Sequence, residues 1–263
     1  MTDRYALLKE LGLTPVWRRR ARPASAATPE AATAAIAPAA VSEAVVHYVA
    51  DALPVQVPDR SARIAALQWS EIPADVAACT ACDLCKTRNR TVPGVGDGRA
   101  EWMFVGEAPG AEEDAKGEPF VGQAGKLLDN MLAALGMRRD KQVYIANVLK
   151  CRPPNNRTPT PQESEACRHY LDRQIALIRP RIIVALGRSA ATTLLNLDAT
   201  IASLRGRVHR YRGVPLVVTY HPAYLLRTLP DKAKAWEDLC LARETMRALL
   251  PDDGLQSAAT VSN

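Results

Sequence analysis

The sequence predicts a three-layer α/β/α domain built around a central four-stranded parallel sheet. Short apolar runs have the length of buried strands, and segments with helical spacing of apolar residues lie between them. Alternation of this kind is typical of a parallel sheet that helices cover on both faces. The predicted strands are 102–106, 143–148, 181–186 and 216–220.

Helix signals fill the gaps between these strands. Apolar residues share one helical face over 127–135, and Gly136 marks the end of that helix. The sequence Thr160-Pro161-Gln162-Glu163 has a capping Thr, Pro at the first helical position and Glu three residues after the cap, and predicts a helix to about residue 178. Further helices are predicted over 189–195 and from 231 onward, the last with three residues facing inward: Trp236, Leu239 and Leu249.

The composition divides the chain into four parts. Residues 1–20 form a short helical segment that ends in a basic run, and residues 21–70 are Ala/Pro-rich, which is typical of a flexible linker with a short ordered piece near 64–69. The folded domain is predicted over 71–250, and the small polar tail 251–263 is expected to be disordered.

The N-terminal segment has an apolar face that is too small to fold alone. Leu7, Leu8 and Leu11 recur at helical spacing, and an isolated helix of this length is marginal in water. We therefore expect residues 1–20 to fold on a protein partner, with the alternative that they pack on the folded domain itself.

Composition and charge narrow the class of protein. The 263 residues carry a formal charge of +6, which favours a polyanionic partner, and they contain no apolar stretch of membrane-spanning length. The first residues lack the apolar core of a secretory signal, so we expect a cytoplasmic, monomeric protein. In that reducing compartment its six cysteines indicate metal ligands or free thiols rather than disulfides.

Two pairs of cysteines indicate a metal centre. Cys79 and Cys82 are spaced Cys-x2-Cys, Cys151 follows a predicted strand, and Cys167 lies on the next helix. Four thiolates suit either a tetrahedral zinc or an iron–sulfur cluster, and spacing alone does not separate the two. Cys85 forms a second Cys-x2-Cys with Cys82, so the register is open, and the downstream pair also suits ordinary buried thiols.

Polar residues follow three of the predicted strands. Gly106-Glu107 ends the first, Asn147 ends the second, and His221 follows the fourth, so all converge on the edge where such sheets bind ligands. The Asn147 amide suits the edge of a pyrimidine, and a histidine there suits donation to developing negative charge. Phe120 in a Gly/Pro loop suits either base stacking or a place in the core.

Together these motifs resemble the uracil-DNA glycosylase superfamily, and within it family 4, the iron–sulfur branch. The resemblance covers about residues 75–245 and rests on order and spacing. Its motifs are Cys79-x2-Cys82, Gly106-Glu107-Ala108-Pro109-Gly110 with Glu113-Asp114, Pro119-Phe120-Val121-Gly122, Asn147-Val148-Leu149-Lys150-Cys151-Arg152-Pro153-Pro154, Cys167, and His221-Pro222-Ala223-Tyr224-Leu225-Leu226-Arg227.

The resemblance implies hydrolysis of the N-glycosidic bond of a uracil flipped out of single- or double-stranded DNA. It implies Glu107 and His221 as catalytic residues. It implies a [4Fe–4S] cluster held by Cys79, Cys82, Cys151 and Cys167. It implies a uracil-binding set of Gly106, Ala108, Phe120 and Asn147, and DNA contacts from Leu225, Arg227, Arg152 and Arg157, with Leu225 filling the gap that the flipped base leaves. Arg88, Arg90 and Lys150 are further candidates for phosphate contacts.

Two departures from relatives elsewhere in the superfamily bear on the chemistry. Ala108 stands where other branches carry an Asp or Asn that positions water, which shifts that role toward Glu107. The loop 153–158 contains no His with which a cross-linking branch attaches itself to uracil, so turnover is expected. The competing interpretations are a non-catalytic iron–sulfur DNA-binding or redox module on the same fold and a zinc-stapled interaction protein.

Overall fold

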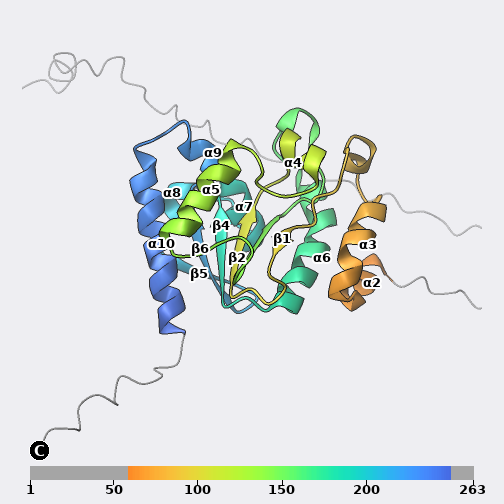
Figure 1. The fold of residues 1–263 in the computed structure, drawn as a ribbon. Helices are drawn as coiled ribbons and strands as arrows, with labels where there is room; N and C mark the ends of the chain where they lie inside the picture. The colour runs from red at the N-terminus through yellow and green to blue at the C-terminus, as the bar shows by residue number, and fades with distance from the viewer. Residues whose placement is uncertain (1–58, 250–263) are drawn as a thin grey trace, which may run out of the picture. The chain divides into compact units, whose positions relative to one another are not determined.

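A computed structural model of the chain describes residues 59–249 (Figure 1). The predicted N-terminal helix, the linker up to residue 58 and the polar tail lie outside the described residues. Within the described part, no helix has both the length and the apolar character needed to cross a bilayer.

The domain is built on a mixed six-stranded sheet with the strand order β1-β3-β2-β4-β6-β5. All four predicted parallel strands are present at its centre, within two residues of the predicted bounds. The strands are β1 (Val95–Gly96), β2 (Trp102–Gly106), β3 (Val143–Asn147), β4 (Ile182–Leu186), β5 (Val208–Tyr211) and β6 (Val214–Thr219).

The prediction of four strands was wrong because two short antiparallel strands border the parallel core. β1 pairs with β3 through two residues, and β5 pairs with β6 as a hairpin. An edge strand packs only part of its surface, so it carries no continuous apolar run. β5 reads Val-His-Arg-Tyr, and only Tyr211 in it is buried.

Helices cover both faces of the sheet (Figure 1). One face packs against α6, α7 and α8, and the other packs against α5 and α10. The α-helices are α2 (Arg60–Ala66), α3 (Ile72–Ala78), α4 (Ala111–Lys116), α5 (Gln123–Ala134), α6 (Pro161–Ile178), α7 (Arg188–Leu195), α8 (Ile201–Leu204), α9 (Pro222–Leu225) and α10 (Asp231–Ala248). The 3-10 turns are η1 (Trp69–Glu71), η2 (Asp83–Lys86) and η3 (Pro154–Asn156).

The end of the predicted linker belongs to the folded domain. Helix α2 lies inside the range 21–70, and its Ile64 is fully buried beside Ile72, Val76 and Tyr170. A single buried isoleucine in a seven-residue helix gives almost no periodic signal, so composition alone extended the linker too far.

The inward face of α10 also differs from the prediction. Leu239 is buried as expected, but Trp236 and Leu249 are each 41% exposed. The buried stripe of this helix runs through Ala235, Leu239, Ala242 and Met246, and the other two residues lie off that stripe.

Helix α6 begins with the predicted capping box, and we expect this cap to stabilise the domain. Thr160 Oγ1 accepts from the Glu163 backbone N–H, and the Glu163 carboxylate accepts from the Thr160 N–H at 2.8 Å. Thr160→Ala should lower the free energy of unfolding by about 1 kcal/mol. Thr200→Ala, which removes the exposed cap of the four-residue helix α8, is the matched control. Urea unfolding of both variants measures the difference, and equal losses would contradict the prediction.

Candidate active site

The strand-end cavity has a volume of about 510 Å³ and opens at the carboxyl ends of the parallel strands. The chain crosses from β3 past β2 to β4, so the strand order reverses at this point of the sheet. The cavity lies there, and parallel sheets of this kind bind ligands at such a reversal. Register pairs Gly106 with Asn147, which places two predicted site residues side by side. The lining includes Glu107, Ala108, Phe120, Asn147, Pro153, Arg157, His221, Tyr224 and Arg227.

The floor of the cavity depends on the missing side chain of Gly106. A β-carbon at Gly106 would lie 2.6 Å from Phe120 Cζ and would overlap Asn147 Oδ1. Asn147 is buried, and its Oδ1 has no hydrogen-bond partner among the described residues. Because an orphaned buried acceptor is costly, this atom indicates a ligand that donates an N–H or O–H here.

Phe120 forms an aromatic wall of the cavity. Its ring is buried to 6% exposure and stacks on the imidazole of His221, with centroids 5.5 Å apart and planes at 29°. The ring thus packs in the core and also lines the cavity, while its stacking on a base stays a prediction.

His221 follows β6 and caps helix α9 with its ring. Nδ1 accepts from the Ala223 backbone N–H at 3.1 Å, so the neutral ring carries its proton on Nε2. Burial, together with the positive charge of Arg227, lowers the pKa of His221 to about 4. At neutral pH the cavity therefore holds a neutral imidazole whose free nitrogen is a donor.

Glu107 is one of two carboxylates that line the cavity, and the other is Glu113. Burial raises the pKa of Glu107, and a hydrogen bond with Ser189 opposes that rise. A second cavity of about 510 Å³ between α6 and α7 shares Glu107 with the first and is also lined by Ser189 and Arg168. Glu107 therefore borders both cavities.

The predicted cysteine ligands come from three segments of the chain, and three of the four belong to one apolar cluster. Cys151 and Cys167 are buried in one apolar cluster with Leu84 and Leu149, and Cys82 packs at its margin. Cys79 lies partly buried at the end of α3. Within residues 59–249, no three or more Cys, His, Asp or Glu side chains stand in the arrangement of a metal site.

Nitrogen donors point at three of the four sulfurs. Arg88 Nη1 donates to Cys151 at 3.1 Å, Arg60 Nη2 to Cys79 at 3.5 Å, and the Lys150 backbone N–H to Cys167 at 3.5 Å. Such donors stabilise negative sulfur, so the chemistry of this donor set fits a thiolate-bound metal centre. Burial raises the pKa of Cys167 to about 12, so metal binding at these thiols would release protons.

The predicted DNA contacts are only partly available at the surface. Leu225 is 1% exposed and packs on Tyr220 and Ala235, whereas its neighbour Leu226 is 42% exposed. In this structure Leu225 is therefore packed inward, and its insertion into DNA stays a prediction. The short helix α9 turns it inward, and the sequence pattern does not distinguish two adjacent leucines.

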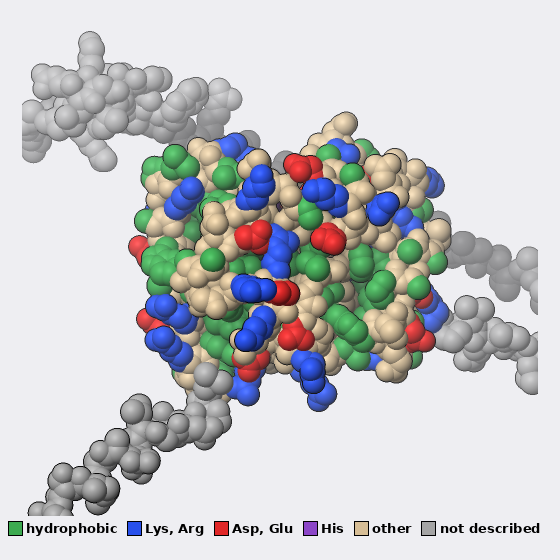
Figure 2. Space-filling model, viewed as in Figure 1, with side chains coloured by type: hydrophobic (Ala, Val, Ile, Leu, Met, Phe, Trp, Pro, Cys, Tyr) green, Lys and Arg blue, Asp and Glu red, His purple; other side chains and the backbone are tan. Residues whose placement is uncertain are grey.

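The basic residues predicted to contact phosphates differ in whether their side chains already have partners within the protein. Arg227 lines the cavity mouth, while Arg157 forms a two-point ion pair with Glu163 and Arg152 donates to Asn156 at 2.8 Å. Lys150 is 1% exposed and donates to the Asn147 carbonyl, so its prediction as a phosphate contact was wrong. Figure 2 shows Lys and Arg side chains scattered over the visible face together with Asp and Glu, without a single basic patch.

Sequence reasoning missed two residues that organise the cavity. Ser189 contacts Glu107, and Arg139 contacts the loop that carries Phe120. Arg139 stands in the run Arg138-Arg139-Asp140, which has the composition of a solvated turn, and Ser189 stands at the start of a helix. Nothing in their local pattern could have distinguished them from surface residues.

Comparison with known proteins agrees with this geometry. The family model of the uracil DNA glycosylase superfamily matches residues 93–240. The chain is 53% identical to a type-4 uracil-DNA glycosylase of Archaeoglobus fulgidus, over 59% of this chain and 82% of that protein. It is 49% identical to the type-4 enzyme of Thermotoga maritima, over 60% and 83%. It is 38% identical to a type-5 uracil-DNA glycosylase of Pyrobaculum aerophilum, over 52% and 67%.

The hydrogen bond and burial of His221 predict how its ring titrates. We expect the ring to stay neutral, with its proton on Nε2, until the pH falls to about 4. Nitrogen NMR of the imidazole measures both the tautomer and the pKa. Arg227→Met should raise this pKa, because it removes a neighbouring positive charge. A ring that titrates near 6.5 in the intact protein would contradict the assigned environment.

Proposed function

The chain belongs to the type-4 uracil-DNA glycosylases of the uracil-DNA glycosylase superfamily, and from this membership we propose that it excises uracil from DNA. The reaction hydrolyses the N-glycosidic bond, frees uracil and leaves an abasic site for base excision repair. The observation that carries the proposal is the unpaired Asn147 acceptor, which faces the floor at Gly106 beside the Phe120 ring.

Base recognition follows from the chemistry of that floor. The N3–H of uracil donates to Asn147 Oδ1, and the pyrimidine stacks on Phe120. Cytosine lacks an N3 proton and leaves this acceptor unpaired, which is costly in a buried place. Gly106 leaves room for Asn147 Oδ1 and the Phe120 ring to lie against its backbone, and Ala108 contributes to the cavity wall.

Bond cleavage uses two of the polar residues that line the cavity, His221 and Glu107. As the C1′–N1 bond breaks, its electron pair moves onto uracil, and the Nε2–H of neutral His221 donates to the oxygen that gains charge. The Glu107 carboxylate stabilises the sugar cation and orients the water that attacks C1′. That water supplies the hydroxyl on the sugar, and its proton completes the free uracil.

The substrate reaches this cavity only as an extruded nucleotide, because uracil is stacked within DNA. Leu226 is exposed and lies in the chain between Tyr224 and Arg227, which line the cavity. We assign to it the filling of the vacated space that the family resemblance had assigned to Leu225. Arg227 and Arg157 line the same cavity, and Arg152 precedes Pro153 of its lining. We assign all three to contacts with phosphates, which carry no sequence information.

The cysteines support a [4Fe–4S] cluster with a structural role. Cys79, Cys82, Cys151 and Cys167 would hold it, and the nitrogen donors on their sulfurs fit that charge. When bound, the cluster would tie the segment before β2 to the loop after β3 and to α6.

The protein acts on DNA inside the cell as a monomer, and docking of residues 1–20 on a partner protein stays a prediction.

Removal of either catalytic side chain should slow uracil release without abolishing DNA binding. Glu107→Gln and His221→Ala should each lower kcat on a uracil-containing oligonucleotide by about 10²–10³, the size of losing one electrostatic stabiliser. Because Glu107 acts as a carboxylate, kcat should fall as the pH drops through its raised pKa, and Glu107→Gln should lose that inflection.

Glu101→Gln is the matched control for these variants. Glu101 lies at the opposite end of β2, where it pairs with Arg181 at 3.5 Å. Wild-type protein that releases no uracil while it binds DNA would instead favour the alternative of a non-catalytic DNA-binding module on the same fold.

The cysteine assignment predicts which thiols retain iron. Cys151→Ala should lose iron and the broad absorbance near ~400 nm, and it should fold poorly, whereas Cys85→Ala should keep both. Metal analysis of purified variants measures the iron content. Loss of iron in Cys85→Ala with retention in Cys79→Ala would show that the ligands are in the other register, and bound zinc would replace the cluster assignment.

A further inference from the structure

Phe120 has a backbone conformation that a residue with a β-carbon rarely adopts. Its φ is 55°, in the left-handed region that favours glycine. Such a conformation persists only where the surroundings hold it in place, and it is typical of functional sites. Other residues of the chain must therefore hold the Phe120 backbone in this unfavourable conformation.

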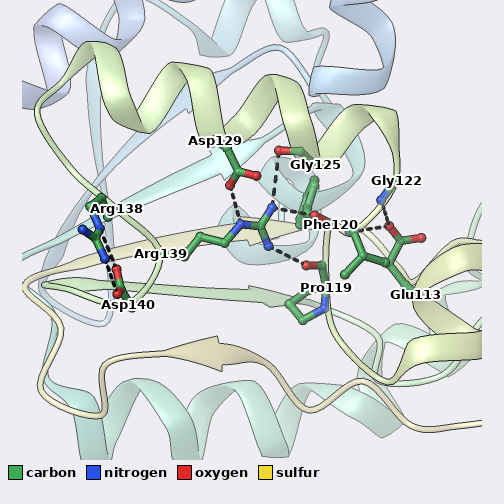
Figure 3. Close-up of polar contacts among 10 residues, drawn as sticks. Glu113, Pro119, Phe120, Gly122, Gly125, Asp129, Arg138, Arg139 and Asp140 are labelled. Carbon is green, nitrogen blue, oxygen red and sulfur yellow. Dashed lines mark hydrogen bonds and ion pairs between the residues drawn. The ribbon is translucent and has the colours of Figure 1, made fainter.

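Arg139 holds the loop by donating hydrogen bonds to its backbone carbonyl groups. Its Nη1 donates to the Pro119 carbonyl at 2.9 Å, and its Nη2 donates to the carbonyls of Phe120 at 2.5 Å and Gly125 at 3.3 Å. Nε pairs with Asp129 of α5, which fixes the plane of the guanidinium (Figure 3). Only an arginine offers this many donors in a fixed planar fork.

Glu113 holds the same loop from its N–H side. Its Oε1 accepts from the backbone N–H groups of Val121 at 3.0 Å and Gly122 at 3.3 Å (Figure 3). At Gly125 a β-carbon would overlap the Phe120 carbonyl, so helix α5 also presses directly on the loop. The peptide units on both sides of Phe120 are thus fixed, and Arg139 is the only charged donor among these contacts.

We propose that Arg139 is a positioning residue that holds the Phe120 ring ready to stack on the extruded uracil. The proposal rests on the proposed function, because it assigns the ring to base binding. Arg139 does not line the strand-end cavity and so touches neither uracil nor DNA there. Its influence on the reaction passes through the Phe120 backbone and should appear in affinity for the base.

The test compares Arg139→Met with Arg138→Met. Arg138 is adjacent in sequence and pairs only with Asp140 on the surface, where both side chains are more than half exposed (Figure 3). Inhibition by free uracil measures base affinity directly. Arg139→Met should weaken it by about 5- to 50-fold, within the range of a lost base-stacking contact, and Arg138→Met should leave it within about twofold.

A double-mutant cycle separates positioning from general destabilisation. In a Phe120→Ala background the ring is gone, so adding Arg139→Met should cause no further loss of uracil affinity. Equal losses with and without the ring, or unchanged uracil affinity in folded Arg139→Met, would overturn the proposal. If Arg139→Met does not fold, Arg139→Lys, which keeps the charge without the planar fork, should show the same dependence on Phe120.

The experiment distinguishes a failure of the role assigned to Arg139 from a failure of the proposed function. Intact protein that neither binds free uracil nor releases it from DNA would refute the assigned activity. Intact protein that does both, combined with an Arg139 variant that loses kcat but not uracil affinity, would refute only the role assigned to Arg139.

Discussion

The parallel pairing of β2 with β3 is the contact on which the site depends. Its register sets Gly106 beside Asn147, and no other alignment would place a backbone without a side chain next to that amide. The space released at Gly106 is filled on one side by Phe120 Cζ and on the other by Asn147 Oδ1. A shift of one residue in this pairing would set Asn147 opposite Val105 or Glu107, whose side chains would change the space at this floor.

Burial sets the protonation states of the catalytic pair in opposite ways. It disfavours charge on both, so it raises the pKa of Glu107 and lowers that of His221. In the proposed reaction the histidine then meets the departing base as a neutral donor. The capping bond from Ala223 fixes which nitrogen holds the proton, so a turn at the start of a four-residue helix determines the chemistry of the ring.

The sequence predicted the structure correctly where a residue's place depends on its near neighbours in the chain. The parallel strands, the Thr160 cap and the polar residues at strand ends all follow from short-range rules. Short-range rules do not predict the edge strands, the burial of Leu225 instead of Leu226 or the contacts of Arg139. Each depends on what a distant segment places nearby, and Arg139 contacts a loop about twenty residues earlier in the chain.

One stretch of chain serves two purposes in this fold. Between Asn147 and Cys167 it leaves the floor of the cavity, carries two of the cysteines proposed as metal ligands and, in the loop at Pro153 and Arg157, contributes to the cavity wall. If the proposed cluster binds there, a preparation with incomplete metal content would also be uneven in the shape of this cavity. Its specific activity would report the fraction of molecules that carry metal, and samples that differ only in iron content would resemble different enzymes.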